Sequence, residues 1–278
     1  MSVHELLRKV LVVVAPVGTN VHEDVKNPLS PHQVAAETVA CAEAGAGMVH
    51  LHVRDSAGNQ TADTAEFGKT LGMIREKSDI IIQGSTGGVS DLSLEERCTA
   101  LNEPMVEVAS LNMGSVNFNE GVYINTLPDI RYWAGRMRDA KVVPELEIFE
   151  AGMVNNVDIL YREGVLRKPL TYSFCLGVKG ALPATSDSVH FLRSIIPSGA
   201  AWGIVHHGMS NLSLLAAAIG MGASFVRVGF EDSVYLSPGR MAATNMDLVD
   251  NVVSLIRRMG MEIAAPGEAR KLLRIGEE

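Results

Sequence analysis

The chain of 278 residues is 47% hydrophobic and 20% charged, which is the balance of an ordinary globular protein. Its formal net charge of −8 argues against nucleic acid or an anionic membrane as the main partner. No stretch reaches the roughly 18–20 consecutive apolar residues of a transmembrane helix, and the apolar N-terminal segment lacks the pattern of a signal peptide.

Short runs rich in β-branched residues recur along the chain, and a segment with helical character follows each of them. Each run is predicted to form a strand. In chain order the predicted strands span residues 10–16, 47–54, 79–85, 105–112, 142–149, 170–177, 200–207 and 223–232.

Helices are predicted between these strands, and the clearest follows the first strand. It spans residues 30–46, with Ser30 as its N-cap and Gly45 near its end. Two further helices are predicted over residues 211–222 and 244–260.

The regular alternation of strand and helix predicts a parallel sheet. Eight such units without a linker favour a closed (β/α)₈ barrel, the TIM barrel, which would form a single domain over residues 1–278. An open dinucleotide-binding sheet is disfavoured, because no GxGxxG follows the first predicted strand.

Polar residues gather at the C-terminal ends of the predicted strands, where such barrels place their active sites. The starts of the same strands are mostly apolar, so a catalytic site is expected at one rim. The residues at that rim are His50, His52, Ser85, Ser110, Asn112, Glu145, Glu147, His206, His207, Arg227, Glu231 and Asp232.

The segment "MVHLHVRD" (48–55) places two histidines two positions apart in a predicted strand. Alternate residues of a strand face the same side, so the imidazoles of His50 and His52 should enter one space. Metal ligation or catalysis is one interpretation, and two core histidines with satisfied hydrogen bonds is the other.

The same argument from strand parity brings carboxylates and an arginine to the histidines. Arg227 and Glu231 share one face of their predicted strand, as do Glu145 and Glu147. Two histidines and one carboxylate with an open position form a catalytic zinc site that can polarise carbonyl groups. For Glu231 and Asp232 the alternative is capping of a helix that follows the strand.

The segment "GSTGG" (84–88) can bind a phosphate or carboxylate through its backbone N–H groups. A tight turn between a strand and a helix also favours glycines, so this motif alone does not distinguish the two.

The three cysteines, Cys41, Cys98 and Cys175, lie far apart and lack CxxC spacing. This pattern argues against a disulfide framework or a cysteine metal site and favours the reducing cytoplasm as the compartment.

Five segments resemble the β-keto acid cleavage enzymes in their order and spacing: "HLHVRD", "STGG", "SLNMGSVNF", "VPELEIFEAGM" and "VRVGFED". The resemblance covers nearly the whole chain, and "HLHVRD" together with "GFED" is its most specific part. It implies a (β/α)₈ barrel, usually in a homotetramer. The reaction it implies converts a β-keto acid and acetyl-CoA into acetoacetate and the CoA ester of the remaining fragment.

The resemblance also implies roles for individual residues. One Zn²⁺ per chain would be held by His50, His52 and Glu231. Arg227 and Asp232 match a dyad at the proton-abstraction step, and Asp232 is the expected base because a guanidinium stays protonated. The residues expected to bind the substrate are Ser85, Ser110, Glu147, Gly87, Gly88 and Asn20.

Two departures from the family pattern bear on the substrate. The prototype acts on 3-keto-5-aminohexanoate and has a glutamate that helps to hold the amino group, whereas this sequence has Asn20. Many members have a Gly-Arg pair after the seventh strand, whereas this sequence has Met209 in place of the arginine. A 5-amino substrate should therefore be poor. We expect His206, His207 and Met209 to line the mouth and to suit a neutral or mildly anionic acyl group.

Three rival interpretations predict different features. A zinc-dependent hydrolase on this barrel would have HxH on the first strand and further ligands on the fifth and sixth, but HxH lies on the second and the sixth strand has no histidine or carboxylate. A metal-dependent aldolase or lyase acting without CoA would be distinguished by an assay lacking acetyl-CoA. A purely structural zinc site usually has four ligands, whereas three converge here.

Overall fold

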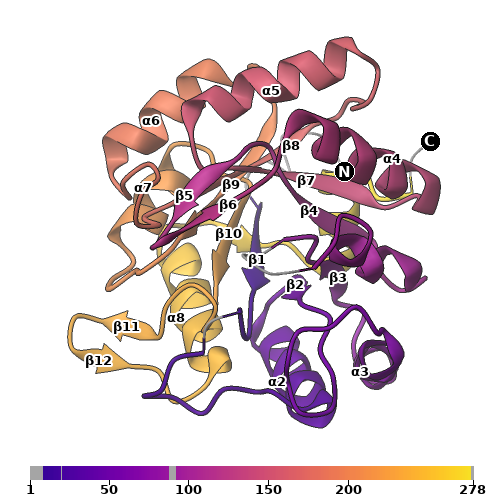
Figure 1. Cartoon of the computed structure of the whole chain (residues 1–278). Coiled ribbons are helices and arrows are strands. Elements are labelled where there is room, and N and C mark those ends of the chain that lie inside the picture. Colours follow the sequence, from indigo (N-terminus) through magenta and orange to yellow (C-terminus); the bar gives the residue numbers. More distant parts are fainter. Residues whose placement is uncertain (1–8, 20, 88–91, 277–278) are drawn as a thin grey trace.

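A closed barrel of parallel strands forms the centre of the computed structural model, which describes residues 9–19, 21–87 and 92–276 (Figure 1). Neighbouring barrel strands follow the chain order, and β10 pairs with β1 to close the sheet. The barrel strands are β1 (Lys9–Val14), β2 (Met48–Leu51), β3 (Ile81–Gly84), β4 (Val108–Asn112), β7 (Val143–Ile148), β8 (Thr171–Leu176), β9 (Ala201–His206) and β10 (Phe225–Val228). The predicted barrel of parallel strands is confirmed.

Helices surround the barrel, and a helical segment follows each barrel strand (Figure 1). After β3 this segment is the 3₁₀ helix η1 (Glu96–Asn102), and a short strand β13 (Glu262–Ile263) pairs with the start of β1. The α-helices are α2 (Pro31–Ala44), α3 (Ala65–Arg75), α4 (Leu127–Ala140), α5 (Ala151–Arg162), α6 (Ser186–Ile195), α7 (Ser213–Gly220), α8 (Asn245–Arg258) and α9 (Pro266–Leu273). Among the described residues, none of these helices combines the length and apolar character needed to cross a bilayer.

The ends of α2 show why the sequence forms a helix there. The Ser30 hydroxyl accepts a hydrogen bond from the backbone N–H of Gln33 at 3.4 Å, and the Gln33 side chain accepts one from the N–H of Ser30 at 3.1 Å. This reciprocal pair satisfies two backbone donors that the first turn leaves unpaired. Gly45 ends the helix with φ +119°, a conformation that glycine adopts without a Cβ clash. The predicted start and end of this helix are confirmed.

The barrel interior is apolar at one end and polar at the other. Side chains from several strands pack together at the N-terminal ends, and this cluster includes Leu11, Val13, Met48, Ile81, Val108 and Phe225. The next inward-facing residues along these strands are polar, for example His50 two residues after Met48 and Gln83 two residues after Ile81. The apolar cluster fills one end of the barrel, so a ligand cavity can form only at the other.

The last barrel strand is shorter than predicted, which changes how Glu231 and Asp232 are placed. The expected strand covered residues 223–232, but β10 ends at Val228, and Gly229 has φ +140°. Glu231 and Asp232 therefore lie in a turn, and strand parity does not set their directions.

A helix does not follow this turn directly. The hairpin of β11 (Tyr235–Ser237) and β12 (Arg240–Met241) comes first, and α8 is capped by the hydroxyl of Thr244. The interpretation of Glu231 and Asp232 as helix caps is therefore wrong.

A second hairpin, of β5 (Val116–Phe118) and β6 (Gly121–Tyr123), follows β4 and lies in front of the barrel in Figure 1. It was not among the predicted elements. Residues from it line the cavity described below.

Candidate active site

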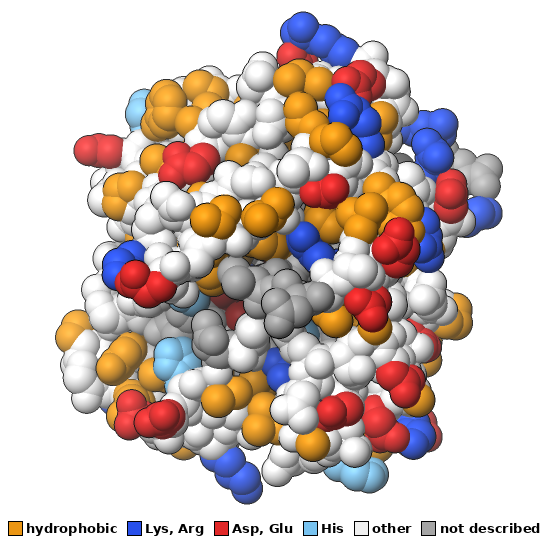
Figure 2. Space-filling model, viewed as in Figure 1, with side chains coloured by type: hydrophobic (Ala, Val, Ile, Leu, Met, Phe, Trp, Pro, Cys, Tyr) orange, Lys and Arg blue, Asp and Glu red, His pale blue; other side chains and the backbone are white. Residues whose placement is uncertain are grey.

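A cavity of about 380 Å³ opens at the C-terminal ends of the barrel strands. Its lining combines the predicted polar residues with apolar and aromatic side chains. The predicted residues that line it are His50, His52, Ser85, Gly87, Ser110, Glu147, His207, Arg227, Glu231 and Asp232. On the face shown in Figure 2, the acidic and basic side chains of the described residues are interspersed rather than separated by sign.

The two histidines of the HxH pair point into this cavity, as predicted. His50 lies in β2 and His52 follows the strand, and their ring centroids are 5.2 Å apart at an interplanar angle of 81°. Burial lowers the pKa of His50 to about 3, so its imidazole is neutral at ordinary pH. A neutral imidazole has the free nitrogen lone pair that a metal ligand needs.

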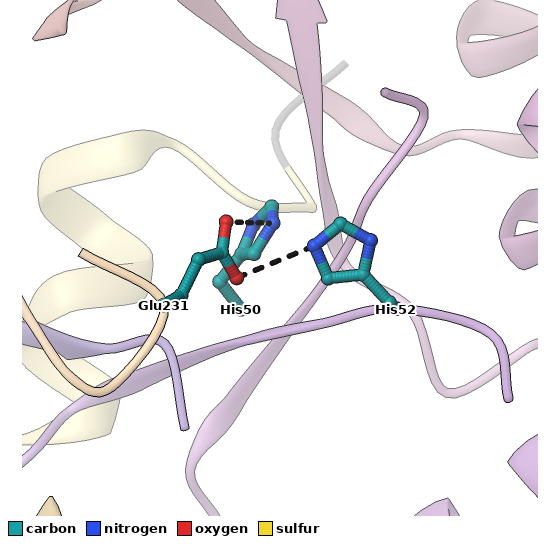
Figure 3. A group of neighbouring side chains, drawn as sticks. All are labelled: His50, His52 and Glu231. Carbon is teal, nitrogen blue, oxygen red and sulfur yellow. Dashed lines mark ion pairs between the residues drawn. The ribbon is translucent and has the colours of Figure 1, made fainter. Parts of the chain in front are cut away.

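Glu231 meets both rings from the turn after β10, and Figure 3 shows the three side chains converging. One carboxylate oxygen lies 3.7 Å from Nε2 of His50, and the other lies 3.3 Å from Nε2 of His52. Burial opposes ionisation of this carboxyl, but Arg227 and the two imidazoles together hold its pKa well below the usual range. Glu231 is therefore an anion in the folded protein.

The donor set fits a divalent cation. One ligand atom from each of His50, His52 and Glu231 can be chosen so that all three lie within 4.8 Å of one another. Two of the buried atoms that face this space, Nε2 of His52 and Oε2 of Glu231, lie 3.3 Å apart, but neither makes a well-aligned hydrogen bond within the described structure. Buried polar atoms without a partner are costly, and a cation bound between them would satisfy both.

Arg227 and Asp232 form a buried ion pair beside this cluster. The guanidinium donates from Nε to Oδ2 of Asp232 at 2.8 Å and from Nη2 to Oδ1 at 2.7 Å, which is a two-point contact. Nη2 also lies 3.1 Å from Oε1 of Glu231. Burial opposes the guanidinium charge, but the carboxylates of Asp232 and Glu231 raise the pKa of Arg227 well above its ordinary value. Arg227 is thus held in one orientation and remains charged.

The cavity wall includes Ser85, Ser110 and Glu147, which the sequence predicted at this rim of the barrel. Glu147 is buried, and this burial raises its pKa to about 8. The side chain is therefore largely protonated at neutral pH and can donate a hydrogen bond.

The backbone of the "STGG" segment is already engaged. The N–H of Thr86 donates to the hydroxyl of Ser110 at 3.3 Å, and the N–H of Gly87 donates to the hydroxyl of Ser85 at 3.2 Å. Without a ligand these two amides pair with hydroxyl groups, so binding of an anion by this segment stays a prediction. Gly88 and Asn20, which were also expected at the substrate site, lie outside the described residues.

A family model described as beta-keto acid cleavage enzyme matches residues 9–275 of the chain. The chain is also 36% identical, over 273 residues, to the "3-keto-5-aminohexanoate cleavage enzyme" of Fusobacterium nucleatum subsp. nucleatum, covering 96% of this chain and 98% of that protein. The chain belongs to the β-keto acid cleavage enzyme family.

Other matches extend this finding. The chain is 33% identical to the "3-oxoadipate:acetyl-CoA acetyltransferase" of Cupriavidus necator over 252 residues, covering 88% of this chain and 87% of that protein. Among solved structures, one described as "Ternary complex of ObcA with C4-CoA adduct and oxalate" matches with a TM-score of 0.75 at 23% identity. The match covers 90% of this chain and 67% of that one. The last comparison supports the barrel fold alone.

One wall of the cavity in this β-keto acid cleavage enzyme was not foreseen from the sequence. Phe118 and Tyr123, from the β5–β6 hairpin, meet Phe149 at centroid distances of 6.1 and 6.4 Å. The run "VNFNEGVY" (116–123) gave a usable signal, because a polar turn with a glycine separates two short runs of strand-forming residues.

The mouth of the cavity differs in part from the expectation. His207 lines it, but Met209 is a buried core residue with 2% exposure and does not belong to the lining, nor does His206. The expectation that Met209 and His206 line the mouth is therefore wrong. Cys175 lines the cavity instead, and burial raises the pKa of its thiol well above the ordinary value.

Proposed function

We propose that the protein converts a β-keto acid and acetyl-CoA into acetoacetate and the CoA ester of the remaining fragment. The observation that carries this proposal is the convergence of His50, His52 and Glu231 beside the Arg227–Asp232 ion pair in one cavity. The names of the relatives support it, since both describe reactions of keto acids and one of them names acetyl-CoA.

The metal of this proposal is one Zn²⁺ per chain, held by His50, His52 and Glu231. Two imidazoles and a carboxylate are a ligand set typical of catalytic zinc, which keeps positions open for water or substrate. When bound, the cation would polarise the keto and carboxylate oxygens of a β-keto acid and make the carbon between them more acidic.

Asp232 then acts as the base in this proposal. Its carboxylate removes a proton from C2 of the β-keto acid, while Arg227 fixes its orientation through the two-point contact. The deprotonated C2 attacks the thioester carbon of acetyl-CoA, a new carbon–carbon bond forms, and the C–S bond breaks to release the CoA thiolate. CoA transfers to the former keto carbon, and cleavage of the original bond between that carbon and C2 releases acetoacetate. The proton count balances when Asp232 returns its proton to C2.

Ser85, Ser110 and Glu147 hold the substrate in this proposal, together with Gly87, Gly88 and Asn20. The hydroxyl groups and the protonated Glu147 can donate hydrogen bonds to carboxylate and keto oxygens. Such donors fix the orientation of a small anion while the aromatic wall covers its tail.

The acyl tail of the substrate is neutral in this proposal. Phe118, Tyr123 and Phe149 form an apolar wall, and Asn20 lacks the carboxylate that would pair with an ammonium group. We expect 3-oxohexanoate to show a higher kcat/KM than either 3-keto-5-aminohexanoate or 3-oxoadipate. If the amino substrate had the highest kcat/KM of the three, this assignment of the tail would be wrong.

The deciding experiment offers a panel of β-keto acids to the purified protein with and without acetyl-CoA and measures acetoacetate and the acyl-CoA product by mass spectrometry. Both products should form only when acetyl-CoA is present. Cleavage without acetyl-CoA would favour a metal-dependent aldolase or lyase, and release of a hydrolysis product would favour the hydrolase.

A cytoplasmic homotetramer is the expected form of the enzyme. The three cysteines are free and buried, as is usual in a reducing compartment. Size-exclusion chromatography with light scattering measures the assembly directly.

A further inference from the structure

A chain of buried hydrogen bonds runs from His50 to a carboxylate on a different strand. Nδ1 of His50 lies 2.7 Å from Oε1 of Gln83, and Nε2 of Gln83 donates to Oε2 of Glu145 at 2.8 Å. The three residues come from β2, β3 and β7, and each is no more than 2% exposed. None of the roles given above uses Gln83 or Glu145.

Glu145 fixes which end of the Gln83 amide faces the histidine. A carboxyl oxygen without a proton can only accept, and it does so whether the rest of the group is charged or neutral. With Oε2 of Glu145 unprotonated, the amide nitrogen of Gln83 faces Glu145 and its oxygen faces His50, which is the orientation in the structure. An amide oxygen can only accept as well, so Nδ1 of His50 has to carry the proton.

We infer that Gln83 and Glu145 are positioning residues that lock the tautomer of His50. With its proton on Nδ1, the neutral ring keeps the lone pair of Nε2 free toward Glu231 and the space where the cation is proposed. This inference rests on the proposed metal centre. It identifies the residues that hold one of its ligands, His50, in the tautomer that can bind a metal. A partner on the second ring nitrogen typically accounts for about 10–100-fold in metal affinity.

Within the part of the chain that the structure describes, His52 has no equivalent lock, which makes the contrast informative. Its Nδ1 lies 2.8 Å from Nε2 of Gln60, and the same amide nitrogen lies 3.0 Å from the hydroxyl of Thr19. A hydroxyl both donates and accepts, so neither neighbour dictates the orientation of the Gln60 amide. His52 can bind a metal through Nε2 only when the oxygen of Gln60 faces its ring.

The test measures two properties of the full-length chain. Imidazole ¹⁵N shifts of the metal-stripped protein report the tautomer of His50, assigned by comparison with His50→Gln. Zn²⁺ affinity is measured by competition with a chromophoric chelator. The variants are Gln83→Met and Glu145→Met, each of which removes one link. The exchange Gln83→Glu/Glu145→Gln keeps an acceptor facing Nδ1 of His50, while the second hydrogen bond reverses so that position 145 donates to position 83. Thr171→Val serves as control because Thr171 pairs with Glu145 across β7 and β8.

We expect wild type, the control and the exchange variant to carry the proton on Nδ1 and to bind Zn²⁺ alike. Gln83→Met and Glu145→Met should lose the preference for that tautomer and bind Zn²⁺ about 10–100-fold more weakly. A proton on Nε2 of His50 in the wild type, or unchanged tautomer and affinity in both single variants, would overturn the inference. If the wild type bound no Zn²⁺, the proposed function would fail instead, because the tautomer measurement needs no metal.

Discussion

Adjacent residues in the turn after β10 have different partners. Asp232 makes the two-point contact with Arg227, whereas Glu231 reaches both histidines. Glu231→Gln should therefore weaken metal binding, because a neutral amide is a poor substitute for a carboxylate on a divalent cation.

Asp232→Asn should keep its metal and fold but lose the base. The expected loss is about 10²–10⁴-fold, seen in kcat more than in KM. Elemental analysis and steady-state kinetics on both variants measure this difference. Should Asp232→Asn lose the metal while Glu231→Gln keeps it, the two roles must be exchanged.

The raised pKa of Glu147 makes the stability of the metal-stripped protein depend on pH. Its pKa is about 8 in the folded protein, against an ordinary value of 4.5, so the folded state binds the proton more tightly. The stability that this tighter proton binding adds to the folded state is fully present below pH 4.5 and is lost as the pH rises through about 8.

Replacement of this carboxyl by an amide tests the effect. Between about pH 5 and 8, Glu147 should lower the free energy of unfolding of the wild type by up to about 1.4 kcal/mol for each unit of rising pH, which is the slope for one proton. Glu147→Gln should lack this part of the slope. Urea titrations of both proteins across this range measure the slopes. Parallel pH profiles would show that Glu147 ionises normally.

At the scale of the element, the end of β10 depends on one glycine. Gly229 has φ +140°, and a Cβ there would lie 2.1 Å from the carbonyl oxygen of Ala15. The close approach matters because the N–H of Glu231 donates to the same oxygen at 3.2 Å. This arrangement turns Glu231 toward the histidines.

Gly229→Ala should cost at least about 1–3 kcal/mol from backbone strain and should also weaken metal binding by moving Glu231. Gly239→Ala in the β11–β12 hairpin is the matched control, because Gly239 also has positive φ, at +74°, but nothing within 4 Å of its Cβ position. Thermal unfolding and metal content distinguish the two variants. Equal metal affinity in both would mean that the turn does not set the position of Glu231.

At the scale of the whole molecule, the proposed metal joins parts of the chain far apart in sequence. Two ligands come from β2 and the residue that follows it, and the third comes from the turn after β10, on the far side of β1 in the sheet. A ligand that binds only the folded state stabilises it, by about 2.7 kcal/mol at a concentration one hundred times its Kd.

Zn²⁺ should therefore raise the Tm of the metal-stripped enzyme in a concentration-dependent way. The His50→Ala/His52→Ala double variant should show no such rise and no bound metal by elemental analysis. A double variant that still carried one metal per chain would contradict the assignment of the ligands.

The sequence by itself determined the barrel, the histidine pair and the rim that carries the polar residues. These features follow from local rules: strand and helix periods repeat along the chain, and parallel strands bring their C-terminal ends to one edge. The resemblance to the family motifs added the proposed roles of Glu231, Arg227 and Asp232. Each of these inferences depends on residues close together in the chain or on a pattern that the whole chain repeats.

Tertiary structure alone decided the rest. Strand parity could not place Glu231, because β10 ends at Val228, three residues before Glu231, and Gly229 with its positive φ redirects the chain. The contact of Gln83 with His50 and Glu145 joins residues 33 and 62 positions away, and no local period encodes it. The aromatic wall likewise depends on how the β5–β6 hairpin lies against Phe149. Hydrogen bonds and packing between distant segments exist only after the barrel has closed, so they are properties of the fold.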